Sequence, residues 1–405
     1  MPDAVIVSAA RSPIGRAFKG SLTTIRPDDL AVQIAQAALG HVPEVDLRAI
    51  DDLILGCGLP AGEQGYNLGR VVAVGLGYDR MPGVTVNRFC ASSLQSTRMA
   101  MHSIRAGEGE IFLSVGVESV SRLQPNPPDS DPATHNPKFA DAQKRSLDIG
   151  QTGASWSDPR DEGLLPDIYL TMGHTAENVA DQWKVTREDQ DEFAARSQTL
   201  AERSADSGFW ANEITPVTLP DGSVVSVDDG PRRGTTADGL AALKPAFRSN
   251  GTVTAGNACP LNDGAAALVV MSDVKARELG ITPVARIIST AATGLSPEVM
   301  GMGPVEATKL ALERANMSLA DIDLFEINEA FAAQVLASAR ELGISLDKLN
   351  VNGGAIAIGH PFGMSGARIT GTLLNGLRAA DKTIGLETMC VGGGQGMAMI
   401  VERLS

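Results

Sequence analysis

The sequence predicts an α/β protein in which strands alternate with helices around a parallel, helix-covered sheet. Three features favour this fold class: short apolar runs of strand character recur along the chain, amphipathic helical patterns separate them, and one proline-rich stretch interrupts the alternation. The 405 residues are enough for two or three domains.

The alternation is clearest in the first 120 residues. Apolar runs at 4–9, 50–55 and 111–117 predict buried strands, because uninterrupted runs of this length are typical of strands covered on both faces. Residues 27–39 and 70–76 predict helices between these strands.

A cysteine lies where a further predicted strand, residues 83–87, gives way to a helix. Apolar residues follow at helical spacing from Leu94, so Cys90 falls near the helix start, with Ser92 or Ser93 as the expected N-cap. Backbone N–H groups and the helix dipole favour a thiolate there. Two interpretations remain open at this point, a buried packing residue and a nucleophile.

The alternation is interrupted by a polar segment, residues 121–167, which predicts an inserted loop domain or a lid. Helices are predicted at 175–183 and 186–207, the second with Thr186 and Asp189 as a capping box. The prolines that mark the segment are Pro125, Pro127, Pro128, Pro132, Pro137, Pro159 and Pro166.

Two distant segments resemble each other. IDDLILGCG, from Ile50, is similar to IDLFEINEA, from Ile322, and in each half a Val-Asn pair then precedes a reactive candidate, Cys90 or His360. The pattern predicts two similar βα halves in one core, with chance similarity of βα patterns as the alternative.

The composition excludes several classes of function. A formal net charge of -14 argues against nucleic acid and anionic membranes as partners, and no apolar stretch or N-terminal leader predicts a membrane span or secretion, so we expect a cytoplasmic protein. Four widely spaced cysteines fit neither a metal site nor a disulfide scaffold. They are Cys57, Cys90, Cys259 and Cys390.

Two glycine-rich stretches in the second half carry further candidates. His360 lies between glycines in VNGGAIAIGHPFGMSGAR, where it could act as the base for Cys90. Cys390 precedes a glycine run that includes Gly392. Only one closing strand is predicted after that run, so it is not a dinucleotide-binding loop, and its N–H groups could instead line an oxyanion site.

A fourth candidate is Asn328, in INEAFAAQVLASARELG. Its amide either caps the predicted helix that follows or orients a water or a carbonyl oxygen.

Four motifs in this order, NRFCASS, NEAF, GGAIAIGHPFGMSGAR and CVGGGQGMA, resemble the thiolase family, and the resemblance runs over the whole chain. It implies the thiolase fold, two similar βα halves in a five-layered αβαβα arrangement with an inserted loop domain. The expected divisions are 1–120 and 251–275 for the first half, 121–250 for the loop domain and 276–405 for the second half. A homodimer or homotetramer is expected by the same resemblance.

The resemblance also implies a mechanism. Cys90 attacks the 3-keto carbon of a 3-ketoacyl-CoA with His360 as base, acetyl-CoA leaves as an enolate that Cys390 protonates, and the CoA thiol takes the acyl group. Asn328, through a water, and His360 hold the enolate oxygen, while the N–H groups of Cys90 and Gly392 hold the second oxyanion.

Coenzyme A is expected as a co-substrate, with no permanently bound cofactor. Arg232 matches the family arginine near its adenine and phosphates, although a lone surface arginine is often only solvated. Met172 and Met300 match positions along the pantetheine and acyl groups, with packing as the alternative. Phe247, in LKPAF, is assigned to the same region, and Cys259 replaces a serine that contacts CoA.

The substrate is less defined. Thr171, Met172 and Gly173 stand where short-chain members have His-Met-Gly, and with the long insertion this favours degradative, β-oxidation-type thiolysis of longer or bulkier 3-ketoacyl-CoA. The alternatives are a biosynthetic acetyl-CoA acetyltransferase and a non-catalytic acyl-CoA or lipid-binding protein. A ketoacyl synthase relative would carry a histidine in place of Cys390.

Overall fold

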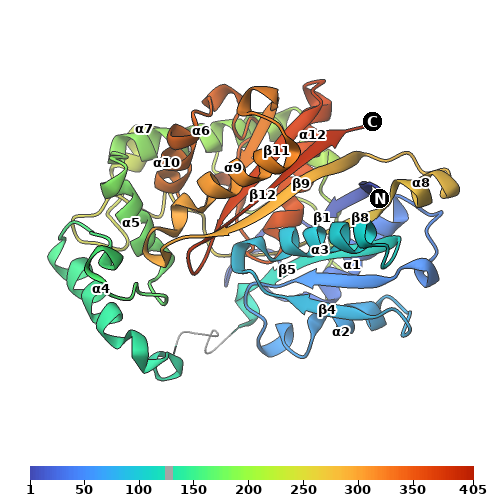
Figure 1. Cartoon of the computed structure of the whole chain (residues 1–405), viewed down its shortest axis with the longest axis horizontal. Helices are drawn as coiled ribbons and strands as arrows, with labels where there is room; N and C mark the ends of the chain where they lie inside the picture. Colours follow the sequence, from blue (N-terminus) through green and yellow to red (C-terminus); the bar gives the residue numbers. More distant parts are fainter. Residues whose placement is uncertain (124–130) are drawn as a thin grey trace.

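The structure, a computed structural model, describes residues 1–123 and 131–405 (Figure 1). Pro125, Pro127 and Pro128 of the predicted irregular segment lie outside the described residues. The strands are β1 (Ala4–Arg11), β2 (Gly15–Arg16), β3 (Asp52–Gly56), β4 (Gly83–Val86), β5 (Ile111–Ser119), β6 (Val217–Thr218), β7 (Val224–Val225), β8 (Asn262–Ser272), β9 (Ala285–Gly294), β10 (Leu324–Ile327), β11 (Ile384–Val391) and β12 (Gln395–Arg403).

The helices predicted at 27–39, 70–76, 175–183 and 186–207 are confirmed, whereas the helix at Ala140–Thr152 lies in the segment expected to be irregular. The helices are α1 (Pro27–Gly40), α2 (Leu68–Gly75), α3 (Ser92–Ala106), α4 (Ala140–Thr152), α5 (Met172–Gln182), α6 (Arg187–Asp206), α7 (Ala237–Ala241), α8 (Asp273–Leu279), α9 (Gly303–Ala315), α10 (Ala332–Leu342), α11 (Ala355–Ile358) and α12 (Ser365–Ala379). The predicted capping box of α6, Thr186 with Asp189, is confirmed.

The two halves of the chain have the same strand order. The first half runs β1-β8-β5-β3-β4 and the second runs β9-β12-β11-β10. β3 and β5 are parallel, as are β10 and β11. β8 is antiparallel to both of its neighbours, β1 and β5, and β12 is antiparallel to both of its neighbours, β9 and β11. A parallel bridge from Phe325 to Leu349 matches the pairing of β3 with β4. The prediction of two similar βα halves is therefore confirmed.

The sheet is mixed, and in this respect the expectation of a parallel sheet is wrong. Helical crossovers join the parallel strands, but β8 follows the long inserted segment and β12 follows β11 through a tight hairpin, and such a hairpin joins only antiparallel strands. The half-sheets meet where β1 pairs with β9 through Val5 and Ile6.

Helices lie outside and between the half-sheets, which gives the layered arrangement. One core packs α1 and α2 on the first half, another packs α9 and α10 on the second, and a third surrounds α3 and α12. Alternate residues of β8 serve two of these cores: Leu268 faces α3 and α12, and Val269 faces α1 and α2. α3 and α12 touch so closely that a Cβ on Gly366 would lie 2.2 Å from the Leu94 nitrogen.

The inserted segment after β5 carries α4 to α7, and α4 lies at the opposite end of the molecule from α8 (Figure 1). The expected division of the chain at 120, 250 and 275 stays a prediction. Among the helices of the described ranges, none is long and apolar enough to cross a membrane.

Candidate active site

Cys90 lies in the short turn between β4 and α3 and is 7% exposed. The residue before it, Phe89, has a φ of 42°, a left-handed conformation that is costly for a bulky side chain. The Phe89 N–H donates to the Asn87 Oδ1 at 2.7 Å, which helps to hold this backbone. Such local strain clusters at functional sites, where the surrounding structure imposes it.

The predicted N-cap of α3 is wrong in its detail. α3 begins at Ser92, after Ala91, and no side chain caps it. The Ser92 Oγ instead accepts from the Arg88 N–H at 2.9 Å, and the Ser93 Oγ accepts from the Ala367 N–H of α12 at 2.9 Å. Ser93 therefore braces the two central helices against each other.

The expected thiolate at Cys90 is not the resting state. Burial raises the pKa of the Cys90 thiol to about 11, and hydrogen bonds from the backbone N–H groups of Gly392 and of Cys90 itself only partly offset this effect. The helix start lowers a thiol pKa where water reaches the sulfur, but here loss of solvation dominates. At neutral pH the side chain is a neutral thiol that points toward two N–H groups.

His360 lies on the loop between α11 and α12, fully buried, with both ring nitrogens engaged. Its Nδ1 lies 2.5 Å from the Ser365 Oγ, which itself donates to the Pro361 carbonyl. Nδ1 must then carry the proton, and Nε2, 3.2 Å from the Asn328 Nδ2, is left as an acceptor. Burial, and secondarily Arg368, lower the pKa of His360 to about 3, so the ring is neutral.

Asn328 follows the end of β10 and is not a helix cap, because α10 begins only at Ala332. This rules out the structural alternative considered for it. Its Nδ2 points to His360, and its Oδ1 is buried without a partner among the described residues. A free acceptor beside a histidine nitrogen is suited to hold a water or another donor.

Glu118, at the end of β5, is a residue that the sequence motifs did not single out. Its buried carboxylate accepts the N–H groups of Gly58 and Gly363, both at 2.8 Å. Gly363 belongs to the His360 loop, and a Cβ on Gly58 would lie 3.3 Å from the Phe89 carbonyl. Glu118 thus fixes the His360 loop beside the Cys90 turn.

Cys390 is the penultimate residue of β11, shortly before the hairpin that holds Gly392. It is fully buried in an apolar cluster, and burial together with Cys90 and Cys259 raises the pKa of its thiol. The three thiols are close enough to affect one another, and Gly392 contacts Cys90 through its N–H. The structure therefore brings Cys90, Cys390 and Gly392 together, and it places Asn328 against His360, whose loop Glu118 holds beside the Cys90 turn.

The residues assigned to the acyl and pantetheine groups surround Cys390. The same cluster contains Met300 and Phe331 at its centre, and Met172 and Cys259 pack against it. Phe247, 39% exposed, stacks edge-on against Phe331 at 6.2 Å between ring centroids. These side chains form an apolar wall beside the thiols.

Arg232 lies apart from the thiols, on the exposed surface, and the structure does not bring it to the reacting groups. It lines a surface pocket together with Arg16, Gly256 and Ala258, the residue before Cys259. Neither arginine forms an ion pair with any described residue. Arg16, at the end of RSPIGR, is a second cation that sequence reasoning missed.

The described residues contain no cluster of side chains suited to a metal ion.

Comparison with known proteins identifies the family. The model of the thiolase N-terminal domain matches residues 4–274, and that of the thiolase C-terminal domain matches residues 281–403. The chain belongs to the thiolase family. It is therefore an enzyme of the acyltransferase class that this family represents.

Relatives with different names are about equally similar to this thiolase. An acetyl-CoA acetyltransferase of Escherichia coli is 45% identical over the full length of both chains. A 3-ketoacyl-CoA thiolase of Bacillus subtilis is 43% identical over 99% of this chain and 100% of its own, and a beta-ketoadipyl-CoA thiolase of Pseudomonas aeruginosa is 44% identical over 99% of both.

Solved structures agree with this assignment. The acetyl-CoA acetyltransferase of Bacillus anthracis superimposes with a TM-score of 0.87 at 39% identity, covering 100% of this chain and 99% of that one. The dimeric peroxisomal thiolase of Saccharomyces cerevisiae has a TM-score of 0.86 at 36% identity, covering 99% and 97%. The thiolase fold predicted from the motifs is confirmed.

Proposed function

We propose that this thiolase cleaves 3-ketoacyl-CoA with free CoA to give acetyl-CoA and a shortened acyl-CoA, through an acyl group on Cys90. The observation that supports the proposal is that two buried thiols lie close together with two N–H groups on the Cys90 sulfur, while a loop fixed beside the Cys90 turn carries a buried, neutral histidine. A protein that only bound acyl-CoA would need neither a second thiol nor a base beside the first.

The first step uses the tautomer of His360. Nε2 takes the proton as the Cys90 sulfur attacks the 3-keto carbon, so proton transfer and attack are coupled; a thiol of this pKa is only about one part in 10⁴ ionised at pH 7. The N–H groups of Cys90 and Gly392 hold the oxyanion of the tetrahedral species, and one such donor is typically worth ~10²–10³ in rate.

The second step breaks the carbon–carbon bond. Acetyl-CoA leaves as an enolate whose oxygen is held by the protonated Nε2 of His360 and by a water on Asn328 Oδ1, and the Cys390 thiol gives its proton to the enolate carbon. The thiol of free CoA then gives its proton to the Cys390 thiolate and attacks the acyl-Cys90, and His360 returns its proton to the Cys90 sulfur as the shortened acyl-CoA leaves. In reverse, the same groups perform a Claisen condensation.

Coenzyme A is the proposed co-substrate, and it occupies the pocket between Arg16 and Arg232. CoA carries several phosphate charges, and two unpaired guanidinium groups on an otherwise acidic protein supply the local attraction. The insertion, residues 121–250, shapes this site. Cys259 and Met172 line the path from the pocket to the thiols.

The acyl group lies against the cluster of Met300, Phe331 and Phe247. Its apolar lining and the long insertion support a longer or bulkier acyl group and the degradative direction, as in fatty-acid β-oxidation. The alternative is the synthesis of acetoacetyl-CoA, which a relative named acetyl-CoA acetyltransferase at 45% identity favours.

A homodimer or homotetramer in the cytoplasm is also proposed. The yeast thiolase of known structure is described as dimeric, and the four cysteines of this chain are all free.

The test is a thiolysis profile of the purified enzyme over 3-ketoacyl-CoA chain lengths. Higher kcat/KM for long chains than for acetoacetyl-CoA is expected. A preference for acetoacetyl-CoA would support the biosynthetic alternative, and no CoA-dependent thiolysis with any of them would contradict the proposed activity.

A further inference from the structure

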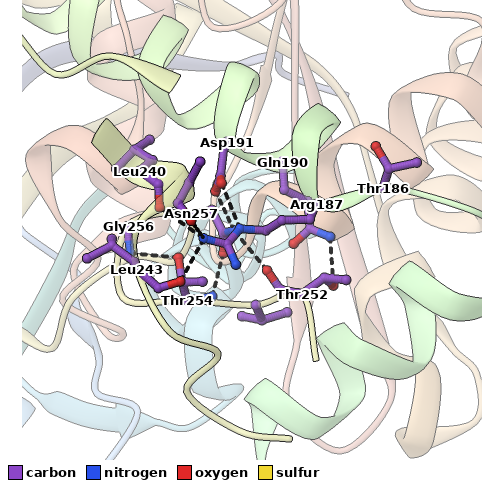
Figure 2. A network of polar contacts seen from close by, with 12 residues as sticks. Thr186, Arg187, Gln190, Asp191, Leu240, Leu243, Thr252, Thr254, Gly256 and Asn257 are labelled. Carbon is purple, nitrogen blue, oxygen red and sulfur yellow. Dashed lines mark hydrogen bonds and ion pairs between the residues drawn. The ribbon is translucent and has the colours of Figure 1, made fainter. Parts of the chain in front are cut away.

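One ion pair on α6, between the partly exposed Arg187 and the buried Asp191, holds two loops (Figure 2). The Arg187 Nε donates to the Asp191 Oδ2 at 2.6 Å, one helical turn away, and the Arg187 Nη2 donates to the carbonyls of Leu240 and Leu243, both at 2.9 Å. Arg187 thereby fixes the end of α7 and the first residue of the segment that carries Phe247.

The other oxygen of the same carboxylate holds the second loop. The Asp191 Oδ1 accepts from the Asn257 Nδ2 at 2.9 Å, and the Asn257 Oδ1 accepts from the Thr254 N–H at 2.8 Å. The Thr254 Oγ1 in turn accepts from the Gly256 N–H at 3.1 Å. Asp191, Asn257 and Thr254 are at most 2% exposed, so the hydrogen bonds among these three residues are shielded from solvent.

These two loops adjoin each other in the lining of one pocket, since a Cβ on Gly256 would lie 2.6 Å from the Leu240 Cδ2. Leu240 and Gly256 both line the pocket of Arg232, and each is held through Asp191, Leu240 by way of Arg187 and Gly256 by way of Asn257 and Thr254. Asn257 also accepts the Ala332 N–H at 2.9 Å through its carbonyl, which anchors the loop that ends at Cys259 to α10.

We propose that Asp191 is a positioning residue for coenzyme A, and that its carboxylate holds the two adjoining loops of the Arg232 pocket in place before CoA enters. The inference rests on the proposed use of this pocket for CoA. Asp191 contacts no reacting group, so its contribution is to binding: a pocket that is already ordered loses less conformational entropy when the ligand binds.

Asp191→Asn is the informative change, because it keeps the size of the side chain and removes one acceptor. An amide has a single oxygen, so it cannot accept from Arg187 and from Asn257 at once, and one buried donor is left facing an NH₂ group. We expect KM for CoA and the Kd of CoA measured by calorimetry to rise about tenfold or more, with kcat within about twofold.

A matched control lies on α4 of the same inserted segment. Lys144 and Asp148 form an ion pair with the same i,i+4 spacing, but their side chains are 75% and 57% exposed. Asp148→Asn makes the same chemical change where water replaces the lost contact, so both constants should stay unchanged.

A second variant keeps the test valid if Asp191→Asn folds poorly. Arg187→Gln leaves the buried Asn257 contact in place and removes only the ties to Leu240 and Leu243, and it should raise the CoA Kd by a smaller factor. The rate of Cys90 alkylation should match the wild type in both variants, because the reacting groups are unmoved.

The inference is overturned if folded Asp191→Asn binds CoA as the wild type does, or if kcat falls while KM is unchanged. Loss of thiolysis in the wild-type enzyme itself would instead contradict the proposed function, so the two failures are distinguishable.

Discussion

The two halves of this thiolase differ most at one equivalent position, the connection into the last strand of each half. In the first half, residues 120–261 lie between β5 and β8 and carry α4 to α7; in the second half, only Gly392, Gly393 and Gly394 lie between β11 and β12. The long connection holds the proposed CoA pocket, and the short one places an N–H group on the Cys90 sulfur.

In this duplicated topology, the long connection of the first half is used for binding and the short connection of the second half for catalysis. A long insertion can add walls and cations without disturbing the sheet, whereas a tight hairpin fixes one backbone N–H to within a hydrogen-bond length. Changes in the second half should therefore lower kcat, and changes in the insertion should raise KM.

The largest effect in this series is expected at Asn328, on the second half. Asn328→Ala removes the Nδ2 contact to His360 and the free Oδ1, so the enolate loses its water and the histidine loses its neighbour. kcat should fall by about 10²-fold or more with KM for CoA nearly unchanged. Steady-state kinetics measure kcat and KM separately. A rise in KM with unchanged kcat would show that Asn328 contributes to substrate binding rather than to catalysis.

The pH dependence of Cys90 alkylation tests its raised pKa. Only the thiolate reacts, so its rate with iodoacetamide should rise about tenfold per pH unit from pH 7 upward and level off only near the pKa of about 11. A small free thiol, measured alongside, should level off earlier. A Cys90 rate that is already constant between pH 7 and 9 would show a thiolate in the resting enzyme.

A smaller effect is expected in the hairpin. A Cβ at Gly392 would lie 3.3 Å from the Phe89 ring, which must move by a few tenths of an ångström and shift the N–H from the Cys90 sulfur. Gly392→Ala should lower kcat about tenfold.

Gly40→Ala is the control for that change, because its Cβ would meet no atom within 4 Å. Equal rates for Gly392→Ala and wild type would show that the hairpin does not need glycine at this point.

The smallest effect is expected at the surface of the insertion. Arg232→Gln removes an exposed charge, which is worth no more than about 1 kcal/mol, so KM for CoA should rise up to about fivefold and the difference should shrink at high salt. Arg233→Gln should change KM less, because Arg233 already pairs with Glu202 and Asp206. A larger rise in KM for Arg233→Gln than for Arg232→Gln would show that Arg233, and not Arg232, contacts CoA.

Much of this fold could be predicted from the sequence, because its signals are local. The spacing of apolar residues placed the strands around residues 4–9 and 111–117, and Thr186 with Asp189 marked the start of α6. The apolar residues after the glycine run predicted the closing strand, β12. The motifs also placed Cys90, His360, Asn328 and Cys390 in one family pattern.

What could not be predicted depends on residues far apart in the chain. Glu118 meets Gly363 across 245 positions, and Asp191 meets Asn257 across 66, so no local pattern shows either contact. The Cys90 pKa is the clearest error. The helix start was visible in the sequence, but the burial that outweighs it arises only when the two halves close around α3 and α12.

The most direct test of the account is the product that Cys390→Ala forms with acetyl-CoA. Because the two thiols have separate roles, mass spectrometry should find an acetyl group on Cys90 while no acetoacetyl-CoA is formed. Acylation needs only Cys90 and His360, whereas removal of the α-proton of acetyl-CoA needs Cys390. Condensation at the wild-type rate in this variant would contradict it.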